Sequence, residues 1–335
     1  MHEMQPKLDE AARYGFDIEL FYEDLEYLAR EMSGRSGAER LKQAAHATRS
    51  MCDDRGIAIV CLQPFMHYEG LRDREDHRRR VKEFRLWVEL AKILRTGIIG
   101  IPSTCLPESE VSGDLELIVA DMREVADLAA PENIQVAYES LAWGTYADTW
   151  EDAWRIVTEV DRPNFGICLD TFNMAARVYA DPSSPSRKNP DADEEMRASL
   201  QRLVKTVNVE KVFFVQVVDA EYLAEPLVEG HPYYDPSQRK RMSWSRNCRL
   251  FYGERDAYLP IAAILRAILI DLGFRGWVSA ELFNRSLTDA DASVPAAHAQ
   301  RAAESWRKIE EDFQLNGRNG TSLNSQLSPT ARAQL

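Results

Sequence analysis

Short apolar runs alternate with longer amphipathic runs along almost the whole 335-residue chain. The short runs are rich in β-branched and aromatic residues, as strands are, and the longer runs carry apolar residues at helical spacing. This alternation is typical of a parallel sheet built from βα units. Strands are predicted at 17–22, 57–62, 97–102, 134–139, 165–170, 211–217 and 276–281. Helices are predicted at 7–14, 38–54, 76–95, 113–129, 147–160, 194–207, 257–272 and 291–313.

The number of predicted strands is one short of the eight that close a TIM barrel. The chain begins in a helix-like stretch at 7–14, before which a barrel would need a strand. We therefore predict an α/β fold of the TIM type, a (β/α)8 barrel without its first strand, with a gap between the strands at 17–22 and 276–281. One barrel domain is expected over residues 1–314. A disordered C-terminal tail is expected over residues 315–335, which have too few apolar residues to build a core.

The chain is acidic, with 54 Asp and Glu against 41 Lys and Arg and a formal net charge of -13. This excess argues against nucleic acid or an anionic membrane surface as the main partner. A small molecule is the expected partner, and the sequence leaves a homo-oligomer open. No run of 18 apolar residues occurs, and the first ten residues contain no apolar signal-peptide core, so neither a membrane span nor a secretory signal is predicted.

The five cysteines are odd in number and have no CxxC spacing. Such a set is typical of reduced thiols in the core of a cytoplasmic protein, rather than of a disulfide framework or a zinc site. The residues are Cys52, Cys61, Cys105, Cys168 and Cys248.

Four of the predicted strands end in an oxygen-bearing side chain: Glu139, Asp170, Gln216 and Glu281. Because side chains at the carboxyl ends of barrel strands meet at one mouth, we expect these four to converge. Three carboxylates and one amide form an all-oxygen set, which suits Mg²⁺ or Mn²⁺ better than structural zinc. Any one of them could instead pair with a neighbouring basic residue, but four together predict a divalent-cation site.

Several motifs resemble those of the xylose-isomerase-like barrel superfamily, which includes sugar-phosphate isomerases, ketose epimerases and endonuclease-IV-type enzymes. Within it, the resemblance is closer to the fungal 3-dehydroshikimate dehydratases. The motifs are IELFYEDL at 18–25, LQPFMHYEG at 62–70, IPST at 101–104, YESLAWG at 138–144, LDTFN at 169–173, SWSRNCRLFYGE at 243–254 and AELFN at 280–284. They extend over nearly all of residues 7–313, and their combination is specific although each piece alone is not.

The resemblance implies a carbon–oxygen lyase that converts 3-dehydroshikimate to protocatechuate with loss of water, in quinate and shikimate catabolism. It also implies that Glu139, Asp170, Gln216 and Glu281 hold a divalent cation. The chemistry agrees, because loss of a proton next to a ketone leaves an enolate, whose charge a divalent cation at that oxygen stabilises. Loss of the hydroxyl then lets the ring become aromatic. Because Glu281 would stand beside the gap, weak metal binding and low activity are expected.

A substrate carboxylate needs a positive partner. Arg246 is the first candidate, because a guanidinium group presents a planar fork, and Arg249 is the second. An ordinary surface arginine is the alternative interpretation of Arg246. His67, which follows the strand at 57–62, is the candidate general base or proton shuttle, since an imidazole can take and return a proton near neutral pH. The alternative is a structural histidine bonded to Glu69.

Three further residues within the motifs are candidate substrate contacts: Trp143, Asn173 and Glu254. Trp143 could instead serve aromatic packing. Asn173 stands where bacterial relatives often have a histidine, which is a departure from the wider family pattern. Two long segments, at 179–193 and 219–256, are predicted as loops, and the second carries Arg246.

Other functions fit parts of the same pattern. A sugar isomerase or epimerase would use the same cation, but a neutral sugar would need no arginine at its carboxylate. A truncated, non-catalytic ligand-binding barrel is a second alternative, which the presence of all four strand-end residues disfavours. An endonuclease-IV-type enzyme is the least favoured, since those sites use many histidines and this chain has six.

Overall fold

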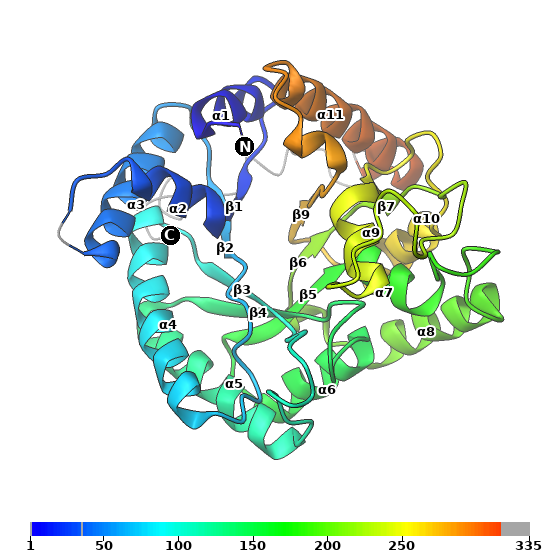
Figure 1. The fold of residues 1–335 in the computed structure, drawn as a ribbon, viewed down its shortest axis with the longest axis horizontal. Coiled ribbons are helices and arrows are strands. Elements are labelled where there is room, and N and C mark those ends of the chain that lie inside the picture. Colours follow the sequence, from blue (N-terminus) through cyan, green and yellow to red (C-terminus); the bar gives the residue numbers. More distant parts are fainter. Residues whose placement is uncertain (1, 35, 316–335) are drawn as a thin grey trace.

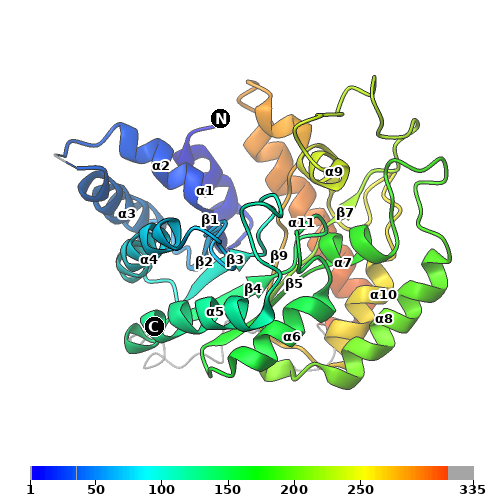
Figure 2. The ribbon, with the colours of Figure 1, turned by 60° about the horizontal axis from the view of Figure 1, so that its bottom comes forward.

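The computed structural model describes residues 2–34 and 36–315 of the chain. Within these residues a central ring of parallel strands is surrounded by helices, as Figure 1 and Figure 2 show from two directions. The predicted disordered tail at 315–335 lies outside the described residues, apart from residue 315.

Seven parallel strands form one sheet, and their order in the sheet is their order in the chain. The strands are β1 (Ile18–Phe21), β2 (Ile59–Gln63), β3 (Ile98–Pro102), β4 (Gln135–Glu139), β5 (Phe165–Asp170), β6 (Val212–Gln216) and β9 (Trp277–Ser279). Each one overlaps one of the predicted runs. The predicted TIM-type barrel with seven strands is therefore confirmed, and so is the helix in place of a strand at the beginning of the chain.

Helices connect the strands and cover the outside of the ring. They are α1 (Met4–Arg13), α2 (Tyr22–Arg30), α3 (Gly37–Asp53), α4 (Arg74–Leu94), α5 (Leu115–Ala129), α6 (Trp150–Val160), α7 (Thr171–Val178), α8 (Ala192–Thr206), α9 (Lys240–Cys248), α10 (Ile261–Leu265) and α11 (Val294–Phe313). Shorter helical segments are η1 (Ala130–Glu132), η2 (Val209–Lys211), the π-helical η3 (Arg266–Asp271) that continues α10, and η4 (Arg285–Thr288). Polar caps begin several helices: the Asp73 carboxylate accepts from two backbone N–H groups of α4, and the Thr149 hydroxyl from one of α6.

Some short elements were not predicted. The segment at 219–256, predicted as a loop, contains α9 and an antiparallel pair of strands, β7 (Asp219–Ala220) and β8 (Arg249–Leu250). Helices α2 and α7 begin directly where a strand ends. Two strand residues, or eight to nine helix residues, carry too few repeats of a pattern to be recognised in a sequence.

Alternate residues of each strand face the inside and the outside of the ring, as the two-residue period of a strand requires. Cys61, Ala137, Cys168 and Phe214 belong to a small apolar cluster in the interior. Each lies two positions before the oxygen-bearing residue that ends its strand, so these end residues also face the interior of the ring. Gly100 makes room for this layer, because a Cβ atom there would come within 3.0 Å of the Cβ of a β2 side chain. The larger apolar core lies outside the ring, between the strands and the helices.

The ring is open on one side. Among the described residues, no strand pairs with the outer edge of β1 or of β9, which are the two ends of the sheet. Figure 1 shows the interruption between these strands, with α1 and α11 outside it. The two helices pack against each other there. The predicted gap beside the strand that precedes Glu281 is therefore confirmed.

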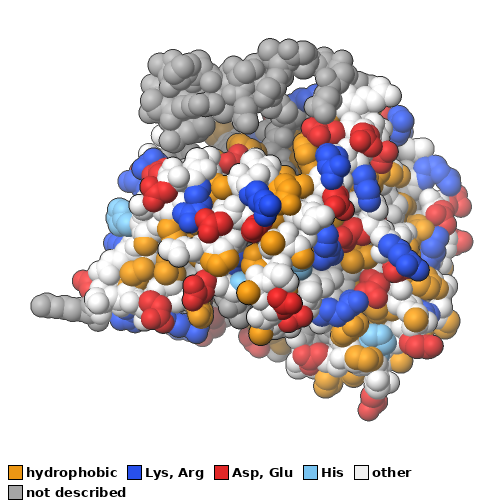
Figure 3. All heavy atoms as spheres, turned by 90° about the horizontal axis from the view of Figure 1, so that it is seen from above, with side chains coloured by type: hydrophobic (Ala, Val, Ile, Leu, Met, Phe, Trp, Pro, Cys, Tyr) orange, Lys and Arg blue, Asp and Glu red, His pale blue; other side chains and the backbone are white. Residues whose placement is uncertain are grey.

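The surface carries both signs of charge. On the face seen in Figure 3, Lys and Arg side chains are interspersed with Asp and Glu side chains. Within the described part of the chain, no helix is long and apolar enough to cross a membrane.

Candidate active site

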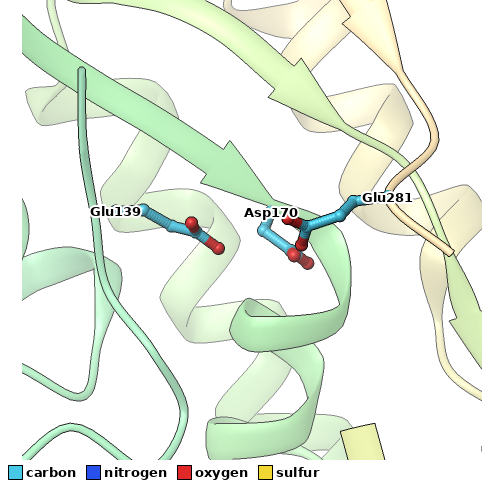
Figure 4. A group of neighbouring side chains, drawn as sticks. All are labelled: Glu139, Asp170 and Glu281. Carbon is cyan, nitrogen blue, oxygen red and sulfur yellow. The ribbon is translucent and has the colours of Figure 1, made fainter. Parts of the chain in front are cut away.

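Three carboxylates meet at the carboxyl ends of the strands. Glu139, Asp170 and Glu281 each offer an oxygen, and these oxygens lie within 4.8 Å of one another. Figure 4 shows the three side chains pointing toward a common space from β4, from β5 and from the segment after β9. Glu139 and Asp170 are the last residues of their strands, whereas Glu281 lies two residues beyond β9. Three of the four predicted ligands are thus brought together.

Asp170 is held through both of its carboxylate oxygens. It is the N-cap of α7, and its Oδ1 accepts a hydrogen bond of 3.0 Å from the backbone N–H of Asn173. Its Oδ2 accepts a bond of 2.7 Å from Nη1 of Arg249. Because the strand runs directly into the helix, the carboxylate lies at the junction of the two and has little freedom to move.

Arg249 lies inside the acidic group. Its side chain is 1% exposed, and Nη1 also donates to Oε2 of Glu281 at 3.1 Å. Its Nε donates to the Ser245 hydroxyl, and its guanidinium carbon lies 4.5 Å from the centre of the Phe172 ring. The guanidinium group is therefore fixed by at least three neighbours, and its charge offsets part of the negative charge of the carboxylates.

Asn173 contacts a second carboxylate of the group. Its Nδ2 donates to Oε1 of Glu139 at 2.7 Å, and its Oδ1 accepts from the backbone N–H of Ala142 at 3.0 Å. The amide therefore orients the Glu139 carboxylate from α7, in addition to the strand that carries it. Asn173 was predicted as a substrate contact, but its side chain is bound to Glu139, a predicted ligand of the cation.

Glu19 and Gln63 extend the group toward the open side of the ring. Nε2 of Gln63 donates both to Oε2 of Glu19 at 2.6 Å and to Oε1 of Glu281 at 2.9 Å. Gln63 was not among the predicted site residues, although it ends β2 as the predicted ligands end their strands. The same strand-end rule would have found it.

The fourth predicted ligand lies at the same level as the others. Gln216 is fully buried, and in the strand register it stands beside Asp170 on one side and beside Ser279 on the other. Its Nε2 donates to Oε2 of Glu19 at 2.9 Å, and its Oε1 is 3.5 Å from Sγ of Cys168. The amide of Gln216 therefore contacts Glu19 and Cys168, which are neighbours of the three carboxylates.

Burial, together with the charges of neighbouring acids, raises the pKa values of three glutamates in this group, Glu19, Glu139 and Glu281. Burial raises the pKa of Glu281 to about 8, although Arg249 works in the opposite direction. Burial raises the pKa of Glu19 to about 7, and burial followed by the charges of Glu281 and Asp170 raises that of Glu139 well above its ordinary value. Like charges gathered in a low-dielectric space resist ionisation, and a cation among them would relieve this repulsion. The all-oxygen donor set and its close spacing therefore fit a hard divalent cation.

His67 lies on the loop after β2, at the same end of the ring. Its backbone has a φ of 55°, an uncommon conformation for a residue other than glycine. Its Nδ1 is 3.5 Å from the Thr104 hydroxyl on the loop after β3. Burial lowers the pKa of His67, and the charge of Arg80 lowers it further. The imidazole is therefore neutral near pH 7, which is the form that can accept a proton.

The predicted alternative partner of His67 is engaged elsewhere. Glu69 is 2% exposed, and its Oε1 accepts from the Thr104 backbone N–H at 2.6 Å and from the Tyr138 hydroxyl at 3.1 Å. Burial raises the pKa of this carboxyl to about 7. The predicted bond between His67 and Glu69 is absent among the described residues, where the hydrogen bond of His67 goes to Thr104.

Arg246 lies on the exposed side of α9. Burial raises the pKa of the Cys105 thiol, just after β3, and the charges of Arg239 and Arg246 oppose that rise. Both arginines therefore lie near the loops of the barrel mouth. Arg239 is bound to the loop after β4 through the carbonyl oxygens of Trp143 and Gly144, at 2.6 and 2.7 Å. Arg246 makes no such bond within the described part of the chain.

Two of the predicted substrate contacts differ in their surroundings. The indole N–H of Trp143 is buried and has no hydrogen-bond partner among the described residues, so it could donate to a bound molecule. Glu254 instead binds Arg301 of α11 through both carboxylate oxygens, at 2.6 and 2.9 Å. Its charge is already balanced by that arginine.

The fold and the site identify the chain as a xylose isomerase-like TIM barrel, and the family model with that description matches residues 8–309. The chain belongs to this family. It is 53% identical over 325 residues to a 3-dehydroshikimate dehydratase of Neurospora crassa, covering 94% of this chain and 90% of that protein. It is 30% identical over 297 residues to a 3-dehydroshikimate dehydratase of Pseudomonas putida, covering 88% of this chain and 38% of the longer bacterial protein.

Part of a longer solved structure has a fold similar to nearly the whole of this chain. It is a fusion of a xylose isomerase-like TIM barrel with a 4-hydroxyphenylpyruvate dioxygenase. The TM-score is 0.69 at 27% identity, and the match covers 97% of this chain and 44% of the fusion protein.

Proposed function

We propose that this chain is a hydro-lyase that converts 3-dehydroshikimate to protocatechuate in quinate and shikimate catabolism. The observation that carries the proposal is the group of three carboxylates within 4.8 Å at the mouth of a barrel that is 53% identical to a dehydratase of this name. The proposal includes the predicted dehydration, its predicted substrate and a cytoplasmic location. The acid-rich site and the arginines above it suit a substrate with a ketone and a carboxylate.

The residues proposed to hold Mg²⁺ or Mn²⁺ are Glu139, Asp170, Gln216 and Glu281. A divalent cation bound there would stabilise the negative charge that develops on the ketone oxygen as the adjacent carbon loses its proton. Arg249 supports the group by fixing Asp170 and Glu281, because its Nη1 contacts both carboxylates. We therefore propose that Arg249 orients these two ligands rather than contacting the substrate directly.

The protein side chains that act on the substrate are proposed to line the loops above the carboxylates. His67 accepts the proton, since its imidazole is neutral and Nδ1 is turned to the Thr104 hydroxyl, which leaves Nε2 for the substrate. Arg246 binds the substrate carboxylate with its planar fork. The unpartnered indole N–H of Trp143 donates to a substrate oxygen. Asn173 acts through Glu139, and Glu254 is left out because Arg301 binds it.

A direct assay tests the proposal. Purified protein is incubated with 3-dehydroshikimate and either Mg²⁺ or Mn²⁺, and the ultraviolet absorbance of protocatechuate is followed. We expect product with at least one cation and none after treatment with a chelator. Absence of product with both cations, from protein shown to be folded, would contradict the proposal.

Arg246 discriminates between this lyase and a sugar isomerase or epimerase with the same cation site. A charged hydrogen bond to a buried carboxylate is worth about 2–5 kcal/mol, so Arg246→Ala is expected to lower kcat/KM about 30- to 5,000-fold. Arg246→Lys should recover only part of the loss, because lysine lacks the fork. Arg255→Ala is the matched control, since Arg255 belongs to the same segment and its side chain is 96% exposed. Unchanged kinetics for Arg246→Ala would remove this residue from the site.

A further inference from the structure

Glu19 connects the two amides of the site. It lies in β1, at the edge of the open side, and its Oε2 accepts hydrogen bonds from Nε2 of Gln63 at 2.6 Å and from Nε2 of Gln216 at 2.9 Å. The first amide comes from the neighbouring strand β2. The second comes from β6, which is separated from β1 in the ring by β9 and by the gap. One carboxylate oxygen therefore bridges the open side through the interior of the ring.

This contact decides which end of each amide faces which neighbour. The oxygen and nitrogen of a glutamine amide have nearly the same shape but opposite hydrogen-bonding roles. Oε2 of Glu19 accepts from both amides, so Glu19 selects the NH2 group of both glutamines. Gln216 is thereby left with its oxygen turned away from Glu19. That oxygen has only the weak thiol donor of Cys168 as a partner, at 3.5 Å, and keeps a second lone pair.

We propose that Glu19 is a positioning residue, which holds the Gln216 amide so that its oxygen is the end available to a cation. The inference rests on the cation site of the proposed function. Side chains that bind the ligands of a metal ion commonly fix their orientation and change the affinity for the metal. Without an acceptor on this side, the amide could turn and present NH2, which repels a cation.

The test measures Mn²⁺ affinity by titration of the metal-free protein, with free Mn²⁺ followed by electron paramagnetic resonance. Glu19→Gln keeps the size of the side chain but removes the group that only accepts. We expect its Kd for Mn²⁺ to rise about tenfold or more. Glu69→Gln is the matched control, because Glu69 is also a carboxyl with a pKa raised to about 7 by burial but contacts Thr104 and Tyr138 instead of the amides. Its Kd should stay within about twofold of wild type.

A double variant tests whether cation binding returns when residue 216 has oxygen at both ends. Glu19→Gln combined with Gln216→Glu keeps the total charge, because one carboxylate is lost and one is gained. It also exchanges the two roles, since the new amide at 19 can donate to the new carboxylate at 216. The carboxylate has no nitrogen end to misorient, so Mn²⁺ affinity should recover most of the loss. Wild-type affinity in Glu19→Gln, or no recovery in the double variant, would overturn the inference. If the wild-type protein itself bound no Mn²⁺, both the cation site of the proposed function and the inference about Glu19 would be wrong.

Discussion

The two sides of the barrel support the candidate site in different ways. On the closed side, β5 is paired along its length with β4 and β6, and all six of its residues are buried. On the open side, β9 has three residues, pairs only with β6, and begins with Trp277, which is 45% exposed. Glu139, Asp170 and Gln216 end the paired strands, whereas Glu281 follows the edge strand.

Side-chain contacts on the open side take the place of the missing strand ladder. Glu281 is held by Gln63 and by Arg249, and Gln63 in turn is bound to Glu19. The closed side is thus positioned by backbone hydrogen bonds and the open side by side chains, which can move more easily. Ligands of a metal site work best when they are held within about 0.5 Å of their required positions. We therefore expect the contacts on the open side to determine the affinity of the site for the cation.

The largest expected difference between the sides is in stability. Breaking a buried ion pair costs about 3–5 kcal/mol, so Asp170→Asn, which deprives the fully buried Arg249 of its closest charged partner, should destabilise the metal-free protein by about 3 kcal/mol. Glu281→Gln should cost less than about 1 kcal/mol, a value typical of partly exposed sites, because the Glu281 side chain is 13% exposed and Arg249 keeps Asp170. Urea unfolding of both variants at pH 7 with chelator measures the two costs. Equal costs, or the reverse order, would contradict the contrast between the sides.

Metal removal is expected to have the next largest effect, because a cation would tie Glu281 to the ligands of the closed side. Mn²⁺ at about 100 times its Kd stabilises the folded protein by about 2.7 kcal/mol through mass action. For a chain of this size we expect the Tm to rise on the order of 5 °C when Mn²⁺ is added back to chelator-treated protein. Asp170→Asn is the control, since it should respond much less. A melting curve that is the same with chelator and with Mn²⁺ would count against the cation site.

The pH dependence of stability follows from the raised pKa values at the open side. In the folded protein the pKa of Glu281 is about 8 and that of Glu19 about 7, both above the ordinary 4.5. Between pH 4.5 and 8 the folded state therefore binds more protons than the unfolded state, so the stability of the metal-free protein should fall as the pH rises through this window. Urea unfolding at several pH values measures this loss of stability. The loss should be smaller in Glu281→Gln; an identical slope would mean that Glu281 does not titrate in this window.

Sequence patterns were sufficient for the strands and for the carboxylates at their ends. A strand of five or six buried residues leaves a continuous apolar run, and the barrel then brings the ends of separate strands together without further information. The three carboxylates were predicted for this reason, and so was the open side, because a strand missing from the pattern is missing from the ring. The short helix α9 and the strand pair of β7 and β8 were not, since elements of a few residues leave no detectable period.

Contacts between the side chains of the site could not be predicted from the sequence. Arg249 was predicted as a second choice for the substrate carboxylate, but it is bound to Asp170 and Glu281. The bond of Gln63 to Glu281 joins residues that are 218 positions apart. Such contacts depend on the register of the ring and on rotamers, which a pattern in one dimension does not contain.

The smallest expected effect is a difference in hydrogen exchange between the two edges of the site. Backbone N–H groups in a fully paired, buried strand exchange only when the structure opens widely, whereas those in a short edge strand exchange through local openings that cost less free energy. In the metal-free protein, the protected amides of β9 should therefore exchange at least tenfold faster than those of β5, which corresponds to about 1.4 kcal/mol or more in opening free energy. Added Mn²⁺ should slow exchange in β9 more than in β5, because the cation would hold Glu281 to the ligands of the closed side. Mass spectrometry of peptides that cover 165–170 and 277–281 measures both rates. Equal protection of the two strands without metal would mean that the side-chain contacts of Gln63 and Arg249 hold the open side as firmly as a strand ladder does, and the lower affinity expected of this site would then lose its structural basis.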